Sequence, residues 1–409
     1  MSADSPAEVM SNMAIKPPVV LEQLSEPDKK QRAILLKKLH DEPASSQLLA
    51  YFERLKEGSA TWDVDTYIEG MKRLANLVGP ERVIYYDEPL KGLHYPDTFA
   101  ELWNKANPQQ PITVYDRDIR YQCPPSWSNG LKDNHQVLTY EGEAPLGHGL
   151  NELLKGPTTI DCGMWVALLL WMGIRYLIGD DLFHAIFKFE KGGFIITQNW
   201  DEPINKAGTV GNLLYPFYDS PSLHKIAYFW ESQTRIQIKT IHNHESYLAK
   251  HLGGLRRLEN VVQVDDDYII FDPGAPQAIL SRSGLEEKLM KAYNAPQSFA
   301  DAERTWMYTT FPTYVHPDFA PKNWGSLAEE AKKYANHTLN EIEWEGSKSD
   351  RENQDYHLVF NFQRLIDSLG EARHGSFSGA VNGDVLSRAK SLKLAAALDG
   401  LLLQLRLSP

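Results

Sequence analysis

The sequence is poor in cysteine, because its 409 residues include only Cys123 and Cys162. Two cysteines form at most one disulfide bond, and they cannot supply the four thiolates of an all-cysteine zinc site. A small fold held together by disulfides and a thiolate-rich metal centre are therefore excluded. So few thiols are typical of a reducing compartment, or of a protein in which one thiol is a working group.

Long hydrophobic runs are also lacking. The longest apolar run, 164–174, has 11 residues, whereas a membrane-spanning helix takes about 20. The first 18 residues contain no basic segment followed by an apolar one, so no secretory signal is expected. We therefore expect a soluble, cytoplasmic protein, and export without a cleaved signal stays open.

Positively charged residues are outnumbered: the chain has 42 Lys and Arg residues and 54 Asp and Glu residues, which gives a net charge of −12. Such a chain repels phosphates and anionic membrane surfaces, which argues against nucleic acid and membranes as partners. Apolar residues at 42% and aromatic residues at 11% are enough for sizeable cores. This composition excludes wholesale disorder.

The spacing of apolar residues divides the chain into four regions. They are a disordered tail (1–28), a helical N-terminal region (29–80), a catalytic α+β domain (81–345) and a helical C-terminal region (346–409). In the third region, short β-like runs alternate with helices and Gly/Pro turns without a regular βαβ repeat, which favours α+β over a doubly wound sheet. In the last region, we expect helices over 356–369 and 387–407.

The most informative segment leads into a wholly apolar helix. A Gly-Pro turn, two threonines and Asp161 precede Cys162, and these residue types favour helix capping. The residues that follow are apolar on every face until Arg175, which predicts a buried helix. Unpaired N–H groups and the helix dipole at its start favour the thiolate, the nucleophilic form of cysteine. Cys162 is thus a candidate nucleophile, or alternatively a small core residue, whereas Cys123 precedes two prolines in a loop and is expected to be structural.

A second segment, 258–274, predicts a hairpin, because two β-rich runs flank the turn-forming aspartates at 265–267. A two-residue loop pairs Glu259 with Asp272, and a three-residue loop pairs Asn260 with Asp272. Directly paired side chains lie about 5 Å apart at Cβ. Either register brings two polar side chains together at the open end of the hairpin, as a catalytic pair or as solvated strand-end residues.

Three histidines, His242, His244 and His251, fall within ten residues. Imidazoles at this density can bind zinc or iron, but the glycines after His251 indicate the end of a helix. We expect no metal site and no other cofactor, while a metal enzyme stays as an alternative. His251 or His244 is instead a candidate base for Cys162.

Four short motifs follow one another over about residues 150–290: Thr159–Cys162 before the apolar helix, Asp181–Phe187, Gly211–Tyr215 and Leu258–Asn260. Together they resemble, in order, the T-I-acid-C helix start, an aromatic helix, a G-D-L-V-Y strand and a G-E-N segment. These belong to the spore-coat type of bacterial protein-glutamine gamma-glutamyltransferase, a papain-related (NlpC/P60-like) family. Asp272 stands where that family has a histidine.

The resemblance implies both a fold and a reaction. The fold is α+β, with a papain-like core in which a buried nucleophile helix packs on an antiparallel sheet. In the reaction, Cys162 attacks a protein glutamine carboxamide, ammonia leaves, and a lysine amine or water resolves the thioester. Glu259 is the implied catalytic partner with Asp272 as its orienter, and Asp161 is a helper.

Aromatic side chains are expected to wall the slot for the glutamine, namely Trp165, Trp200 and those within 308–314. Two other hypotheses stay open. One is a papain-like cysteine protease or amidase that uses His251 or His244 as its base. The other is a catalytically inactive interaction protein on the same fold, which the aspartate at position 272 favours.

Overall fold

The computed structural model describes residues 44–78, 83–85, 122–132, 135–189, 191–204, 210–219, 235–252, 255–272, 277–297, 301 and 333–377. Four expectations lie wholly or partly outside these residues. They are the disordered tail, the first part (29–43) of the helical N-terminal region, the aromatic segment 308–314 and the helix over 387–407.

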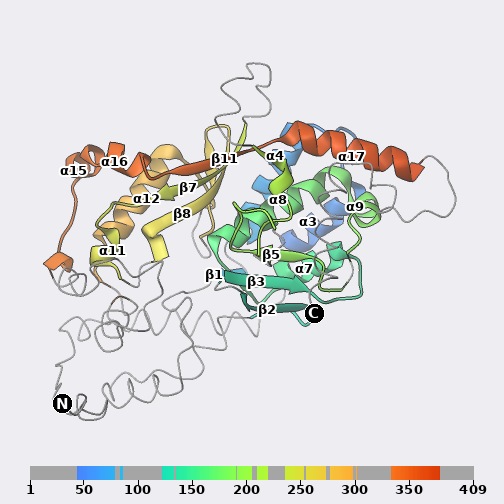
Figure 1. Cartoon of the computed structure of the whole chain (residues 1–409), viewed down its shortest axis with the longest axis horizontal. Helices are drawn as coiled ribbons and strands as arrows, with labels where there is room; N and C mark the ends of the chain where they lie inside the picture. The colour runs from blue at the N-terminus through green and yellow to red at the C-terminus, as the bar shows by residue number, and fades with distance from the viewer. Residues whose placement is uncertain are drawn as a thin grey trace, which may run out of the picture.

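The described helices form two groups on opposite sides of a central sheet (Figure 1). One group surrounds the long helix α8 and comprises α3 (Ser46–Glu57), α4 (Val64–Val78), α7 (Leu146–Lys155), α8 (Cys162–Ile178), α9 (Asp180–Ile186) and α17 (Phe362–Phe377). The other comprises α11 (Tyr247–Lys250), α12 (Arg282–Asn294), α15 (Glu341–Gly346) and α16 (Lys348–Glu352). Each group shares its own cluster of buried side chains with the sheet.

The central sheet has six strands in the order β10-β9-β8-β7-β11-β6, and all neighbours are antiparallel. Its strands are β6 (Tyr218–Asp219), β7 (Ile236–His242), β8 (Leu258–Val264), β9 (Asp267–Ile269), β10 (Ile279–Ser281) and β11 (Tyr356–Phe360). A three-stranded antiparallel sheet joins β2 (Trp127–Lys132), β3 (His135–Tyr140) and β5 (Ile195–Thr197). β1 (Val83–Tyr85) pairs in parallel with β4 (Thr158–Ile160), directly before α8. The described part of the chain is therefore α+β, as expected from the sequence.

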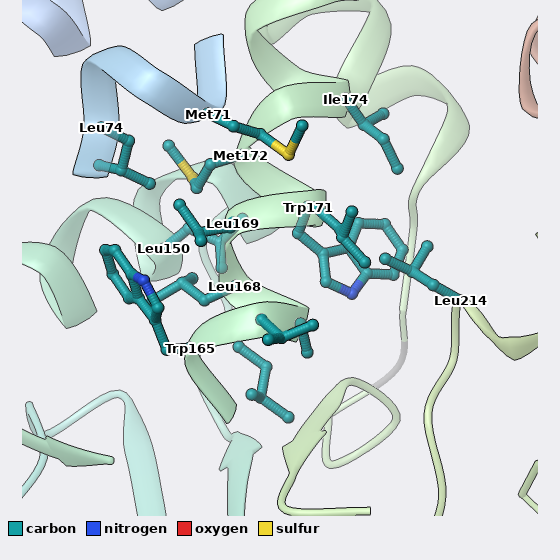
Figure 2. Close-up of a cluster of buried hydrophobic side chains, with 14 of the residues drawn as sticks. Met71, Leu74, Leu150, Trp165, Leu168, Leu169, Trp171, Met172, Ile174 and Leu214 are labelled. Atoms are coloured by element: carbon teal, nitrogen blue, oxygen red, sulfur yellow. The ribbon is translucent and has the colours of Figure 1, made fainter. Parts of the chain in front are cut away.

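Helix α8 is the centre of the larger core. All 17 of its residues are buried, which confirms the prediction drawn from its lack of a polar face. Met71 and Leu74 of α4 lie against it, together with Leu150 of α7 (Figure 2). Arg175 is its only charged side chain, and it is neutralised by Asp180 and bonded to Asn151.

Strand β8 divides its side chains between the two cores. Val262 and Val264 belong to the core that contains α8, whereas Val261 packs with Leu285 and Leu289 of α12. Because successive side chains of a strand point to opposite faces, the even-numbered residues of β8 face α8 and the odd-numbered residues face α12.

The hairpin of β8 and β9 has the shorter of the two predicted loops. Val264 pairs with Asp267, so Asp265 and Asp266 form a two-residue turn. Asp265 has a φ of 54°, which a short hairpin turn requires and which aspartate tolerates. Its carboxylate accepts two hydrogen bonds from Arg235, at 2.7 and 2.9 Å.

The sequence-based prediction for the C-terminal region is wrong at its start. Residues 356–360 form strand β11, which lies between β7 and β6, and the helix begins only at Phe362. The run Tyr-His-Leu-Val-Phe is rich in strand-forming aromatic and branched residues, and pairing with β7 overrides its weak helical spacing. The described parts of both terminal regions pack into the core around α8, with α4 on one side and β11 in the sheet.

Residues 211–215, which resemble a strand, lead instead into the short 3-10 helix η2 (Tyr215–Phe217). Pro216 lacks the N–H that a strand ladder needs, so only two residues pair as β6. Among the described helices, none is by itself long and apolar enough to cross a membrane. α8 and α9, bent by 116° at Gly179, pass that test of length and composition only as a pair.

Candidate functional site

The site begins where β4 turns into α8. Asp161 is the N-cap residue of the helix, and its Oδ1 accepts the backbone N–H of Met164 at 2.8 Å. Cys162 is therefore the first helical residue, as the sequence predicts, and it is 4% exposed. This position places the sulfur at the positive end of a fully buried helix, where a negative charge is favoured.

The side chain of Asn260 of β8 reaches the cysteine. Its Nδ2 donates to the Sγ of Cys162 at 3.3 Å. Its Oδ1 accepts the hydroxyl of Thr240 at 2.8 Å, and Thr240 is the residue directly opposite Asn260 on β7. The threonine thus fixes the orientation of the amide, with the N–H directed at the sulfur.

The side chain of Gln198 holds Asp161 and is itself held by the backbone of Gln136. Gln198 donates to the Oδ2 of Asp161 at 2.7 Å, and the Oε1 of Gln198 accepts the backbone N–H of Gln136 at 2.7 Å. Both glutamines are buried. Because both carboxylate oxygens of Asp161 accept hydrogen bonds from the protein, its role in the structure is to fix the start of α8.

The two predicted slot tryptophans lie in different surroundings. Trp200 lies beside the start of α8, since a Cβ on Gly163 would be 2.9 Å from its Cδ1. It also contacts the exposed ring of Tyr356, with 6.1 Å between centroids. Trp165 is instead a core residue stacked on Phe271, with 5.2 Å between ring centroids. Only Trp200 is thus placed at the edge of the site.

Glu259 and Asp272 are brought together, as the hairpin register predicts, but not beside Cys162. Arg256 links them, with 2.5 Å to Glu259 and 2.6 Å to Asp272, and Lys288 of α12 also contacts Asp272. Glu259 is an odd-numbered residue of β8 and lies on the α12 face, whereas Cys162 lies on the other face. The structure therefore separates the predicted catalytic partner from the predicted nucleophile by the thickness of the sheet.

The electrostatics of this ion cluster favour the charged forms of Asp272 and Arg256, whereas burial lowers the pKa of Lys288. Burial raises the pKa of Asp272, but the stronger combined attraction of Arg256 and Lys288 lowers it below its usual range. Burial likewise lowers the pKa of Arg256, and Glu259 and Asp272 reverse this and raise it. The cluster is thus a compensated group of buried charges rather than a poised acid and base.

The two predicted histidine bases also lie on the α12 side. The ring of His251 contacts Asp301 at 3.0 Å and the carbonyl oxygen of Tyr293 at 3.0 Å. His244 contacts Ser246 at 2.8 Å, and its ring lies 5.2 Å from that of Tyr293. Tyr293 belongs to α12, so the structure places neither imidazole at the start of α8.

Three residues of the site were missed in the sequence: Thr240, Gln136 and Gln198. Asn260 was considered only as a partner of Asp272. The Sγ of Cys123 contacts the carbonyl oxygen of Trp127 at 3.1 Å, and burial raises the pKa of this thiol. Within the described residues, no three His, Cys, Asp or Glu side chains form a group that could hold a metal ion.

Comparison with known proteins adds no relative. No protein-family model, no curated protein and no solved structure matches the chain.

Proposed function

We propose that the protein is a cysteine-dependent acyltransferase with a papain-like core, acting on glutamine side chains of proteins through a thioester on Cys162. The observation that carries this proposal is the 3.3 Å contact between the side-chain amide of Asn260 and the sulfur of Cys162 at the first residue of a buried helix.

The nucleophile in this mechanism is the thiolate. The N-terminus of α8 and the amide N–H of Asn260 both favour a negative charge on the sulfur. The hydroxyl of Thr240 occupies the amide oxygen and so keeps the N–H directed at Cys162. A thiol that ionises in this way gives its proton to solvent before the reaction begins.

The chemistry then proceeds in two steps. The thiolate of Cys162 attacks the carbonyl carbon of the glutamine carboxamide, the C–N bond breaks, and the leaving nitrogen takes a proton from water to depart as ammonia. A lysine amine or a water molecule next attacks the thioester and loses a proton to solvent. This step forms an isopeptide bond or a glutamate and returns the thiolate.

This mechanism differs from the one that the sequence motifs imply. Glu259 is committed to Arg256 on the opposite face of the sheet, and His244 and His251 contact Tyr293 of α12. A thiolate stabilised by a helix start and an amide needs none of them to attack. Asn260 therefore takes the place of Glu259 as the working partner of Cys162 in the proposal.

The first test is the pH profile of Cys162 alkylation by iodoacetamide in a Cys123→Ser background. Asn260→Asp replaces the N–H donor by a carboxylate of the same shape, which opposes a thiolate. We expect its profile to move to higher pH and its rate at neutral pH to fall by about tenfold, the value of one hydrogen bond to a charged group. Glu259→Gln is the matched control, because it changes the neighbouring residue on the other face.

A shift with Glu259→Gln and none with Asn260→Asp would overturn the proposed partner. If Cys162 does not react with iodoacetamide in the Cys123→Ser background, with or without Asn260→Asp, the proposed nucleophile is overturned.

The second test is the reaction itself. A glutamine-containing peptide is supplied with a fluorescent primary amine, and amine incorporation and ammonia release are both measured. We expect both with the full-length protein and neither with Cys162→Ser. Peptide-bond cleavage without ammonia would instead identify a protease.

A second candidate function is a binding protein on the same fold. The burial of Cys162, which is 4% exposed, favours it, because a nucleophile must be reached by its substrate. An unreactive Cys162 in the first test would select this candidate.

A further inference from the structure

A second group of titratable side chains lies on the α12 side of the sheet and takes no part in the proposed reaction. Its four side chains, His244, Ser246, Tyr293 and His337, are linked in a row by three hydrogen bonds. His244 Nδ1 lies 2.8 Å from Ser246 Oγ, Ser246 Oγ lies 2.9 Å from Tyr293 Oη, and Tyr293 Oη lies 2.8 Å from His337 Nδ1. The row joins the loop before α11 to α12 and to the residues before α15.

The direction of these hydrogen bonds is fixed at one end by a backbone group. The N–H of Ser246 donates to Nδ1 of His244 at 3.2 Å, and an N–H can only donate. Nδ1 of His244 is therefore an acceptor, and this imidazole is neutral with its proton on Nε2. The hydroxyl of Ser246 accordingly donates to the same nitrogen.

The rest of the row follows by counting protons. Ser246 has one hydroxyl proton, which His244 receives, so Tyr293 must donate to Ser246. Tyr293 then has no proton left for His337, so Nδ1–H of His337 donates to Tyr293. The four residues form a one-way chain in which the hydrogen bonds reinforce one another, and its two histidines carry their protons on different ring nitrogens.

Protonation of His244 breaks this arrangement. A proton on Nδ1 can be accommodated by Ser246 Oγ if each hydroxyl in the chain turns round and His337 carries its proton on Nε2 instead. The backbone N–H of Ser246 cannot turn, and it is left facing another N–H. The protonated form therefore loses a backbone hydrogen bond and the direction of the whole chain.

The surroundings of His244 also oppose its charge. Burial is the main cause that lowers the pKa of His244, and Arg351 of α16 and the neighbouring His337 lower it further. Glu245 opposes them and raises it. Tyr293 of α12 also lies against the imidazole, edge to face with 5.2 Å between ring centroids, and burial raises its own pKa.

We infer that His244 is a pH-sensitive latch: neutral His244 holds the segment 337–346 against α12, and protonation at Nδ1 loosens that segment. The segment carries Trp344, whose ring lies 6.5 Å from that of His244. Lys250 and Asn294 hold the same segment at the carbonyl oxygens of His337 and Leu339. These two contacts do not involve His244, so its protonation weakens the hold on the segment without detaching it.

The experiment is hydrogen exchange, read by mass spectrometry on peptides from 337–346, between about pH 7.5 and about pH 5, where histidines titrate. Labelling times are scaled for the intrinsic pH dependence of exchange. We expect the wild-type segment to lose protection at the lower pH. His244→Asn places an amide oxygen where Nδ1 accepts and cannot be protonated there, so it is expected to stay protected at both values.

Two further variants make the result specific. Tyr293→Phe interrupts the chain without removing His244, and it is expected to weaken protection of 337–346 at neutral pH. His184→Asn changes another histidine whose pKa is lowered by burial, but on α9, and it is expected to leave 337–346 as in the wild type. A wild-type segment equally protected at both pH values would overturn the latch, as would an unaltered pH response in His244→Asn. Neither result bears on Cys162, so the acyltransferase proposal stands or fails separately.

Discussion

Asn260 donates its side-chain N–H to the sulfur of Cys162 across 3.3 Å, although the two residues are 98 positions apart in the chain. The contact joins the first residue of α8 to the strand β8 that packs on it. Of the two adjacent polar residues of that strand, Glu259 and Asn260, it is therefore Asn260 that can act on the thiol.

Thr240 is expected to control the thiol through the Asn260 amide. Thr240→Val removes the hydroxyl that occupies Asn260 Oδ1 at nearly the same volume, so the amide is free to turn its oxygen toward the sulfur. Alkylation of Cys162 should then slow by about tenfold at neutral pH. Thr240→Ser keeps the donor and should restore the wild-type pH profile. Equal profiles for the valine variant and the wild type would remove Thr240 from the site.

Arg256 is expected to matter for stability rather than reactivity. Arg256→Met leaves Glu259, which is 2% exposed, without its cation. Breaking a buried ion pair from one side costs about 3 kcal/mol, which urea unfolding measures. The double variant Arg256→Met with Glu259→Gln removes the stranded charge and should recover part of the loss. A double variant as unstable as the single one would contradict this account.

Asp272 should make the free energy of unfolding depend on pH under acidic conditions. Its folded pKa is lowered, with burial outweighed by the attraction of Arg256 and Lys288, while the unfolded value is about 3.9. The stabilisation is therefore fully present above that unfolded value and is lost as pH falls through the folded pKa. The stability difference between wild type and Asp272→Asn should be constant above about pH 5 and shrink below about pH 4. Urea titrations in steps of pH test this, and a constant difference throughout would refute it.

Gly163 is expected to be intolerant of a side chain. A Cβ there would lie 2.8 Å from the carbonyl oxygen of Gln198 and 2.9 Å from Trp200. Gly163→Ala should destabilise the fold by about 1–3 kcal/mol, as overpacking does, and it should also change the rate of Cys162 alkylation. Gly130→Ala is the control, because nothing lies within 4 Å of its Cβ. Similar thermal midpoints for the two variants would argue against close packing at Gly163.

The hairpin shows how far sequence alone leads toward the site. Its turn residues limited the register to two choices, and the structure has one of them. That register brings Glu259 and Asp272 together, as expected. The identity of the side chain beside Cys162 did not follow, because strand alternation shows that Glu259 and Asn260 point to opposite faces but not which face receives α8.

The two residues that follow Asn260 in β8 explain why its face could not be predicted. Val261 and Val262 are both fully apolar and both fully buried, one in each core. A strand buried on both faces has no hydrophobic alternation to orient it. Only the packing of α8 on one face and α12 on the other decides which residue meets the thiol.

The mixed α+β character, the buried helix and the position of Cys162 at its start could all be predicted from the sequence, because capping residues and apolar spacing act locally. Three features could not be predicted: 356–360 is a strand, Glu259 belongs to an ion cluster, and Asn260 faces the sulfur. These outcomes depend on contacts between segments far apart in the chain. Strand pairing and burial at such contacts can stabilise a conformation that the local sequence does not favour.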